Sequence, residues 1–178
     1  MKLFQEISDA FEEATIAFVL VGGHAVNHYG VTRHTADVDL MILSSDKDGA
    51  VGVLATLGYR EDHSSELFVR CIHADAATMD IDLLLVAEDT LAKIRASAVP
   101  VAIEEREVLV PSLDHLLAMK LHSLRYTPAR MLKDGGDIVA LLLEHHRNPD
   151  DIQDICDRFG SDAVMKKIRF LYECEQSA

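Results

Sequence analysis

Apolar and polar residues follow two different patterns in the first part of the chain. Residues 3–14 place an apolar side chain at every third or fourth position, which predicts an amphipathic helix. Residues 17–21 are a continuous apolar run, typical of a buried strand, and residues 36–43 alternate between polar and apolar positions as a second strand would. We expect a short helix over 24–29, closed by a glycine, and another helix that ends near residue 57.

Two further strands and then a series of helices follow. Residues 66–73 and 79–86 have strand patterns joined by a short turn, which predicts a hairpin. We expect a short helix over 88–96 and one or two short strands within 99–111. From there on the pattern is helical, with helices predicted over residues 111–126, 137–147, 150–158 and 161–174.

Together these elements predict an α+β fold. We expect residues 1–110 to form a small mixed β-sheet core flanked by helices. Residues 111–178 are expected to form a helical C-terminal half that packs on this core or continues it as one domain. The length of 178 residues suits one ordinary domain, or one domain with a helical appendage. Apolar residues make up 49% of the chain and charged residues 26%, which is the balance of a soluble globular protein.

Charge and cysteine content exclude several classes of protein. The formal net charge of −13 argues against general binding to nucleic acid, although a local basic patch can still hold one. The three cysteines have no C-x-x-C spacing and indicate neither a disulfide framework nor a zinc site. The sequence contains neither a signal-peptide pattern nor an apolar run of membrane-spanning length. We therefore expect a cytoplasmic protein with no membrane partner.

The residues that point to chemistry begin in the stretch 19–42. Its first strand ends in Gly22 and Gly23, which have no Cβ and stand where a strand meets a helix, a place that suits a phosphate. Asp37 and Asp39 follow on the next strand and share one face, because side chains of a strand alternate. Two carboxylates directed at one spot repel each other unless a cation lies between them. The stretch therefore predicts a phosphate site beside a site for a hard cation.

A second strand repeats the pair of aspartates. Asp80 and Asp82 lie within 79–86 and also share one face. A single D-x-D pair is more often a solvated strand edge, but two pairs on separate apolar strands favour a site. If the two strands are neighbours, three carboxylates converge. They are enough for two Mg²⁺ or Mn²⁺ ions whose shells are completed by substrate phosphates. This predicts metal-assisted phosphoryl or nucleotidyl transfer.

The whole stretch VGGHAVNHYGVTRHTADVDLMI resembles the GG/GS–x(n)–DxD signature of the nucleotidyltransferase superfamily typified by DNA polymerase β. It is most similar to small stand-alone bacterial members, the minimal nucleotidyltransferases and the type IV toxin nucleotidyltransferases. The form G-x-x-R-x-T-x-D-x-D is supplied here by Gly30, Arg33, Thr35, Asp37 and Asp39. A later segment, LLAMKLHSLRYTPARMLKDGGDIVALL, resembles the helical half of the family. The resemblance covers about residues 15–145 and implies a nucleotidyltransferase core.

The resemblance also implies a role for each matching residue of the core. Gly22 and Gly23 would cradle the triphosphate, although many members have serine in place of Gly23, with a hydroxyl that contacts the phosphates. Asp37 and Asp39 would bind both metal ions. Asp82 would be the third carboxylate, which binds the catalytic metal and activates the incoming hydroxyl. Asp80 is the alternative for this third position.

Two cations are implied as ligands of the nucleotide phosphates, Arg33 and Lys120. From the residues alone, Lys120 is equally well a solvated lysine on the surface of its helix. Lys133, Asp134 and Asp137 either cap the start of a helix with acidic residues or shape the nucleotide cleft.

The resulting hypothesis is an Mg²⁺-dependent enzyme that moves a nucleoside monophosphate from an NTP to a hydroxyl group. The acceptor would be a small molecule, a tRNA or a protein, and one version of the hypothesis is a toxin–antitoxin component with a cognate antitoxin or other protein partner. The alternative is a catalytically degenerate nucleotidyltransferase fold that serves as a binding or regulatory module. A DxD glycosyltransferase is disfavoured, since its motif normally follows a longer nucleotide-binding half.

Overall fold

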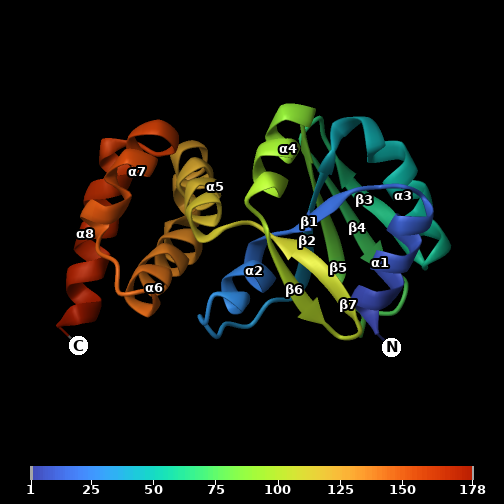
Figure 1. The fold of residues 1–178 in the computed structure, drawn as a ribbon, viewed down its shortest axis with the longest axis horizontal. Helices are drawn as coiled ribbons and strands as arrows, with labels where there is room; N and C mark the ends of the chain where they lie inside the picture. The colour runs from blue at the N-terminus through green and yellow to red at the C-terminus, as the bar shows by residue number, and fades with distance from the viewer. Residues whose placement is uncertain (1, 178) are drawn as a thin grey trace. The chain divides into compact units, whose positions relative to one another are not determined.

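A five-stranded mixed β-sheet lies at the centre of the first part of the structure (Figure 1), a computed structural model that describes residues 2–177. Its strands are β1 (Phe18–Leu20), β2 (Asp37–Leu43), β3 (Tyr59–Ser64), β4 (Phe68–His73) and β5 (Asp80–Val86). They have the order β1-β2-β5-β4-β3. β2 and β5 pair in parallel, whereas the other neighbours pair antiparallel. The predicted α+β class with a small mixed sheet is confirmed.

Helices cover this sheet because its strands alternate between a polar and an apolar face. Most apolar positions of β2 and β5 are buried, among them Leu40 and Leu83. The helix stripe of Phe4, Ile7 and Phe11 is buried as well. In Figure 1 the first and third helices lie beside each other next to the sheet. Further elements of this part are α1 (Leu3–Glu13), α3 (Lys47–Thr56), α4 (Glu88–Ala96) and a hairpin of β6 (Val99–Ile103) with β7 (Arg106–Val110).

The chain divides into two units by its internal contacts. The first unit extends up to Ala25 and resumes over His34–Ser112, and the second combines Val26–Arg33 with the chain from Leu113 onward. The second unit is helical and contains a π-helical turn over Met131–Gly135. Its helices are α5 (Leu113–Tyr126), α6 (Gly136–Glu144), α7 (Gln153–Phe159) and α8 (Asp162–Gln176). We keep the predicted domains, 1–110 and 111–178, as a proposal.

Two elements differ from the sequence prediction. β3 is not predicted, because four of its six residues are exposed and charged or polar instead of alternating with apolar ones. It is an edge strand, and charged side chains there discourage pairing with other chains. The second helix, α2 (Gly22–His28), starts at the first glycine and not at residue 24. Within residues 2–177, no helix has the length and apolar character needed to cross a membrane.

Truncating the buried face of β5 should destabilise the sheet. Leu83 is 0% exposed, whereas Leu67 is 72% exposed. We expect Leu83→Ala to lower the free energy of unfolding by about 3 kcal/mol, because it removes buried methyl groups and leaves a cavity. The control Leu67→Ala should change it by less than about 0.5 kcal/mol. Urea denaturation followed by circular dichroism measures both, and equal losses would contradict the assignment of this face to the core.

Candidate active site

Four carboxylates lie in two rows on neighbouring strands. Asp37 on β2 is opposite Asp80 on β5, and Asp39 is opposite Asp82, in parallel register. Neighbouring strands lie about 4.8 Å apart, so paired side chains on one face are neighbours. The expectation that the two aspartate strands are adjacent is therefore confirmed.

Asp82 is the most deeply buried of these four carboxylates. It is 6% exposed, and its Oδ1 atom has no hydrogen-bond partner among the described residues. Burial raises the pKa of Asp82 to about 6; the charge of Arg70 opposes the shift, and Asp39, Asp37 and Asp80 add to it. A buried carboxylate oxygen without a partner is costly unless a cation binds it. The position therefore fits a ligand of a hard divalent cation.

Arg70 is a residue of this site that the sequence reasoning missed. It lies on β4, directly opposite Asp82. Its Nη2 atom donates a hydrogen bond of 2.9 Å to Asp80 Oδ2, and its Nη1 atom lies 3.5 Å from Asp82 Oδ2. The available signal was a lone arginine within the apolar strand that forms a hairpin with the second aspartate pair.

The four carboxylates do not form a complete metal-coordination site by themselves. Within residues 2–177, no three His, Cys, Asp or Glu side chains converge closely enough to hold a metal ion by themselves. Mg²⁺ is usually bound by one or two carboxylates, with waters and substrate phosphates completing its shell. The arrangement on β2 and β5 fits that mode of binding.

Gly22 allows the backbone to pass next to Asp39. Gly22 has a φ of +62°, and a Cβ atom built there would lie 1.8 Å from Asp39 Oδ2. The amide of Val21 donates to the carbonyl oxygen of Asp39 at 2.9 Å, which fixes the two segments side by side. Asp37 is held by Thr35, whose hydroxyl lies 3.3 Å from Asp37 Oδ1. The glycine turn and the first aspartate pair are thus adjacent, as the motif predicts.

The two predicted phosphate-binding cations lie together in the second unit. Lys120 Nζ is 2.6 Å from Asp137 Oδ2, and Arg33 Nη1 is 2.7 Å from the same oxygen. Asn27 orients Arg33 by hydrogen bonds to its backbone N–H and C=O at 3.1 Å and 3.0 Å. Lys120 is only 6% exposed, so it is not a solvated surface lysine. Its role as a phosphate ligand stays a prediction.

Asp134 completes this cluster. Its carboxylate accepts hydrogen bonds from Arg130 Nε at 2.6 Å and Ser123 Oγ at 2.9 Å, and lies 3.3 Å from Lys120 Nζ. Burial works to raise the pKa of Asp134, but the bonds from Arg130 and Ser123 and the charge of Lys120 outweigh it, so the pKa is lowered. Asp134 and Asp137 are therefore buried ion-pair partners and not solvent-exposed helix caps.

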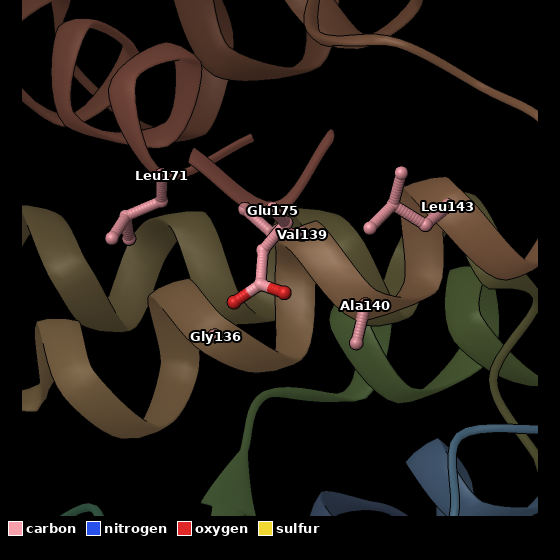
Figure 2. A pocket seen from close by; sticks show the side chains of 6 residues that line it. All are labelled: Gly136, Val139, Ala140, Leu143, Leu171 and Glu175. Atoms are coloured by element: carbon pink, nitrogen blue, oxygen red, sulfur yellow. The ribbon is translucent and has the colours of Figure 1, made fainter. Parts of the chain in front are cut away.

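A separate groove of about 190 Å³ lies between α6 and α8 of the second unit. Figure 2 shows the residues that line it, with Leu171 and Glu175 on α8 and the others on α6. Its lining is Gly136, Val139, Ala140, Leu143, Leu171 and Glu175. None of these is a predicted site residue, and the mostly apolar lining does not suit a triphosphate.

Comparison with known proteins gives one family and several related folds. The model of the family described as aminoglycoside-2''-adenylyltransferase matches residues 3–111, which include the glycine turn and both aspartate pairs. No curated protein matches the chain.

Several solved structures are similar to this chain, and three of them illustrate the likeness. ANT(2'')-Ia in complex with adenylyl-2''-tobramycin has a TM-score of 0.67 at 16% identity, over 88% of this chain and 94% of that one. The lincosamide antibiotic adenylyltransferase LnuA, bound to lincomycin, has a TM-score of 0.58 at 17% identity, over 79% of this chain and 94% of that one. A nucleotidyltransferase from Thermotoga maritima, described as putative, has a TM-score of 0.55 at 15% identity, over 74% of this chain and 88% of that one. At these identities the similarity shows a shared fold.

Replacing Gly22 should strain the turn that carries the site. We expect Gly22→Ala to lower the free energy of unfolding by about 1–3 kcal/mol, because alanine is strained at positive φ and its Cβ would displace Asp39. Gly52, in α3, is the control, since a Cβ there meets nothing within 4 Å. Gly52→Ala should stabilise the helix by about 0.5–1 kcal/mol. Urea denaturation distinguishes the two, and shifts of the same sign would contradict this view of Gly22.

The lowered pKa of Asp134 should make stability depend on pH. A carboxylate with a lower pKa in the folded state stabilises the fold above its unfolded pKa, and this contribution is lost as the pH falls through the folded value. We expect Asp134→Asn to be less stable than the native protein at pH 7, and the difference to shrink below about pH 4. Asp89→Asn, whose side chain is 73% exposed, is the control. Urea unfolding at several pH values measures this, and a gap independent of pH would contradict it.

Proposed function

Because the chain belongs to the aminoglycoside-2''-adenylyltransferase family, we propose that it transfers AMP from ATP to a hydroxyl group of a small cationic molecule and releases pyrophosphate. Membership confirms the resemblance to polymerase-β-like nucleotidyltransferases, and the chain is a nucleotidyltransferase. The observation that carries the proposal is the row of Asp39 and Asp82 on adjacent strands, with the Gly22 turn beside it. A triphosphate and divalent cations are the ligands that such a row and turn suit.

We assign the metal ligands to Asp37, Asp39 and Asp82, with two Mg²⁺ or Mn²⁺ ions as the implied cofactors. The chemistry these ions supply when bound is neutralisation of the triphosphate and activation of the attacking hydroxyl. Gly22 and Gly23 would face the triphosphate, because glycines let a backbone approach it closely. Asp82 would orient the acceptor hydroxyl and accept its proton, since its buried Oδ1 has no hydrogen-bond partner within residues 2–177.

Arg33 and Lys120 remain our proposed ligands of the nucleotide phosphates. They belong to a cluster in which three cations, the third being Arg130, surround the two carboxylates of Asp134 and Asp137. The excess of one positive charge suits an anion. In the present arrangement both residues pair with Asp137, so binding a phosphate requires them to share their hydrogen bonds with it.

The acceptor class follows from the family and from charge. ANT(2'')-Ia is seen with adenylyl-2''-tobramycin and LnuA with lincomycin, which supports a small-molecule acceptor here. The net charge of −13 attracts cationic molecules such as aminoglycosides and repels tRNA. A protein acceptor, a toxin–antitoxin role and a cytoplasmic location stay predictions from the sequence.

Removing one proposed metal ligand should strongly reduce the rate of transfer. We expect Asp39→Asn to lower the rate of AMP transfer from ATP by on the order of a thousandfold, because metal stabilisation of transition-state charge is worth several kcal/mol. The assay uses α-labelled ATP and Mg²⁺ with a panel of aminoglycosides and lincosamides, and it follows label in the antibiotic. The exposed variant Asp89→Asn should keep native activity.

Two outcomes would change the proposal. Unchanged transfer by Asp39→Asn would contradict the assignment of the metal ligands. If the folded native protein labelled no antibiotic from any of the four α-labelled NTPs and bound no NTP, the alternative of a regulatory module would be favoured.

A further inference from the structure

Arg70 is a cation inside a site that otherwise consists of carboxylates. The three strands β2, β5 and β4 place Asp39, Asp82 and Arg70 in one row, because Asp39 pairs with Asp82 and Asp82 pairs with Arg70. Paired residues of adjacent strands point to the same face of the sheet. The guanidinium therefore occupies the side of the carboxylate row that faces away from the glycine turn.

The guanidinium of Arg70 lies closer to Asp80 than to Asp82, the two carboxylates of β5. Asp80 accepts a hydrogen bond of 2.9 Å from Arg70, which is a good charge-assisted bond. Asp82 is 3.5 Å from the guanidinium, and its Oδ1 is buried without a hydrogen-bond partner among the described residues. Asp80 is thus hydrogen-bonded to Arg70, while Asp82 has one oxygen, Oδ1, that no described residue binds.

We propose that Arg70 is a built-in counter-ion that removes Asp80 from metal coordination and leaves Asp37, Asp39 and Asp82 as the metal ligands. This inference rests on the proposed nucleotidyl transfer and makes Arg70 a positioning residue of that site. It also gives Asp80 a function of its own, which is to hold Arg70 beside the third ligand.

The counter-ion has a consequence for the order of binding. Four carboxylates and no arginine would attract divalent cations strongly in the absence of substrate. A fixed positive charge next to the site opposes that attraction, and the negative charge of an arriving triphosphate offsets it. Arg70 therefore couples tight binding of the metal to binding of the nucleotide.

Metal binding to the nucleotide-free protein tests this directly. Arg70→Gln should bind Mn²⁺ on the order of ten times more tightly than the native protein, because a nearby positive charge is lost and Asp80 becomes available. Titration followed by electron paramagnetic resonance of free Mn²⁺ gives the affinity. Arg60→Gln is the matched control: Arg60 is on the adjacent strand β3, its side chain is 69% exposed, and its loss should leave the affinity within about twofold.

A second variant identifies the carboxylate that Arg70 controls. In Arg70→Gln combined with Asp80→Asn, the Mn²⁺ affinity should return to within about threefold of the native value, because the released carboxylate is gone. A double variant as tight as Arg70→Gln would overturn the assignment of Asp80. Circular dichroism of each variant confirms that it is folded, and a purely structural Arg70 would alter stability without tightening Mn²⁺ binding.

The remaining outcomes separate this inference from the proposed function. If the native protein binds Mn²⁺ and transfers AMP but Arg70→Gln binds Mn²⁺ no more tightly, the counter-ion is overturned and the nucleotidyl transfer stands. If the folded native protein and Arg70→Gln both fail to bind Mn²⁺, and no NTP is used, both are overturned.

Discussion

The parallel pairing of β2 with β5 is the constraint on which the rest of the first unit depends. Its register sets Asp37 beside Asp80 and Asp39 beside Asp82, so that like charges are neighbours on one face. Like charges on adjacent strands destabilise a sheet, and the opposite face has to compensate. That face is apolar and fully buried, as Leu40 and Leu83 show. Hydrophobic burial therefore maintains an electrostatically unfavourable surface, which is a common property of binding sites.

Each unit contains a buried aspartate, and the surroundings shift the pKa of the two aspartates in opposite directions. In the second unit Asp134 has protein cations and a hydroxyl as partners, and its pKa is lowered. In the first unit burial raises the pKa of Asp82 to about 6, and one of its oxygens has no hydrogen-bond partner within residues 2–177. A carboxylate with all its partners supplied by the protein serves structure. A buried carboxylate oxygen without a protein partner is costly, and this cost is the physical basis for the proposal that Asp82 binds a metal ion.

The sequence predicts what local patterns determine. Helices, most strands and the shared face of each aspartate pair follow from periodicity, because a strand repeats every two residues. β3 is not predicted, because its charged and polar residues do not alternate with apolar ones. The difference between Asp80 and Asp82 is not local either: both share one face, and they differ in burial and in their distance from Arg70 on another strand. In the same way, Lys120 is buried beside Asp134 and Asp137, which come 14 and 17 residues later in the chain and balance its charge.

The hairpin formed by β4 and β5 bears on how the acidic face is assembled. Arg70 and Asp80 are ten residues apart, whereas the partners across β2 and β5 are far more distant in sequence. Short loops close with a smaller loss of entropy, and hairpins form within about 1–10 μs. We therefore expect the guanidinium to be in place on β5 before the parallel strand arrives. β2 would then pair its two aspartates with a strand whose charge is already reduced, which lowers the electrostatic barrier to this parallel pairing.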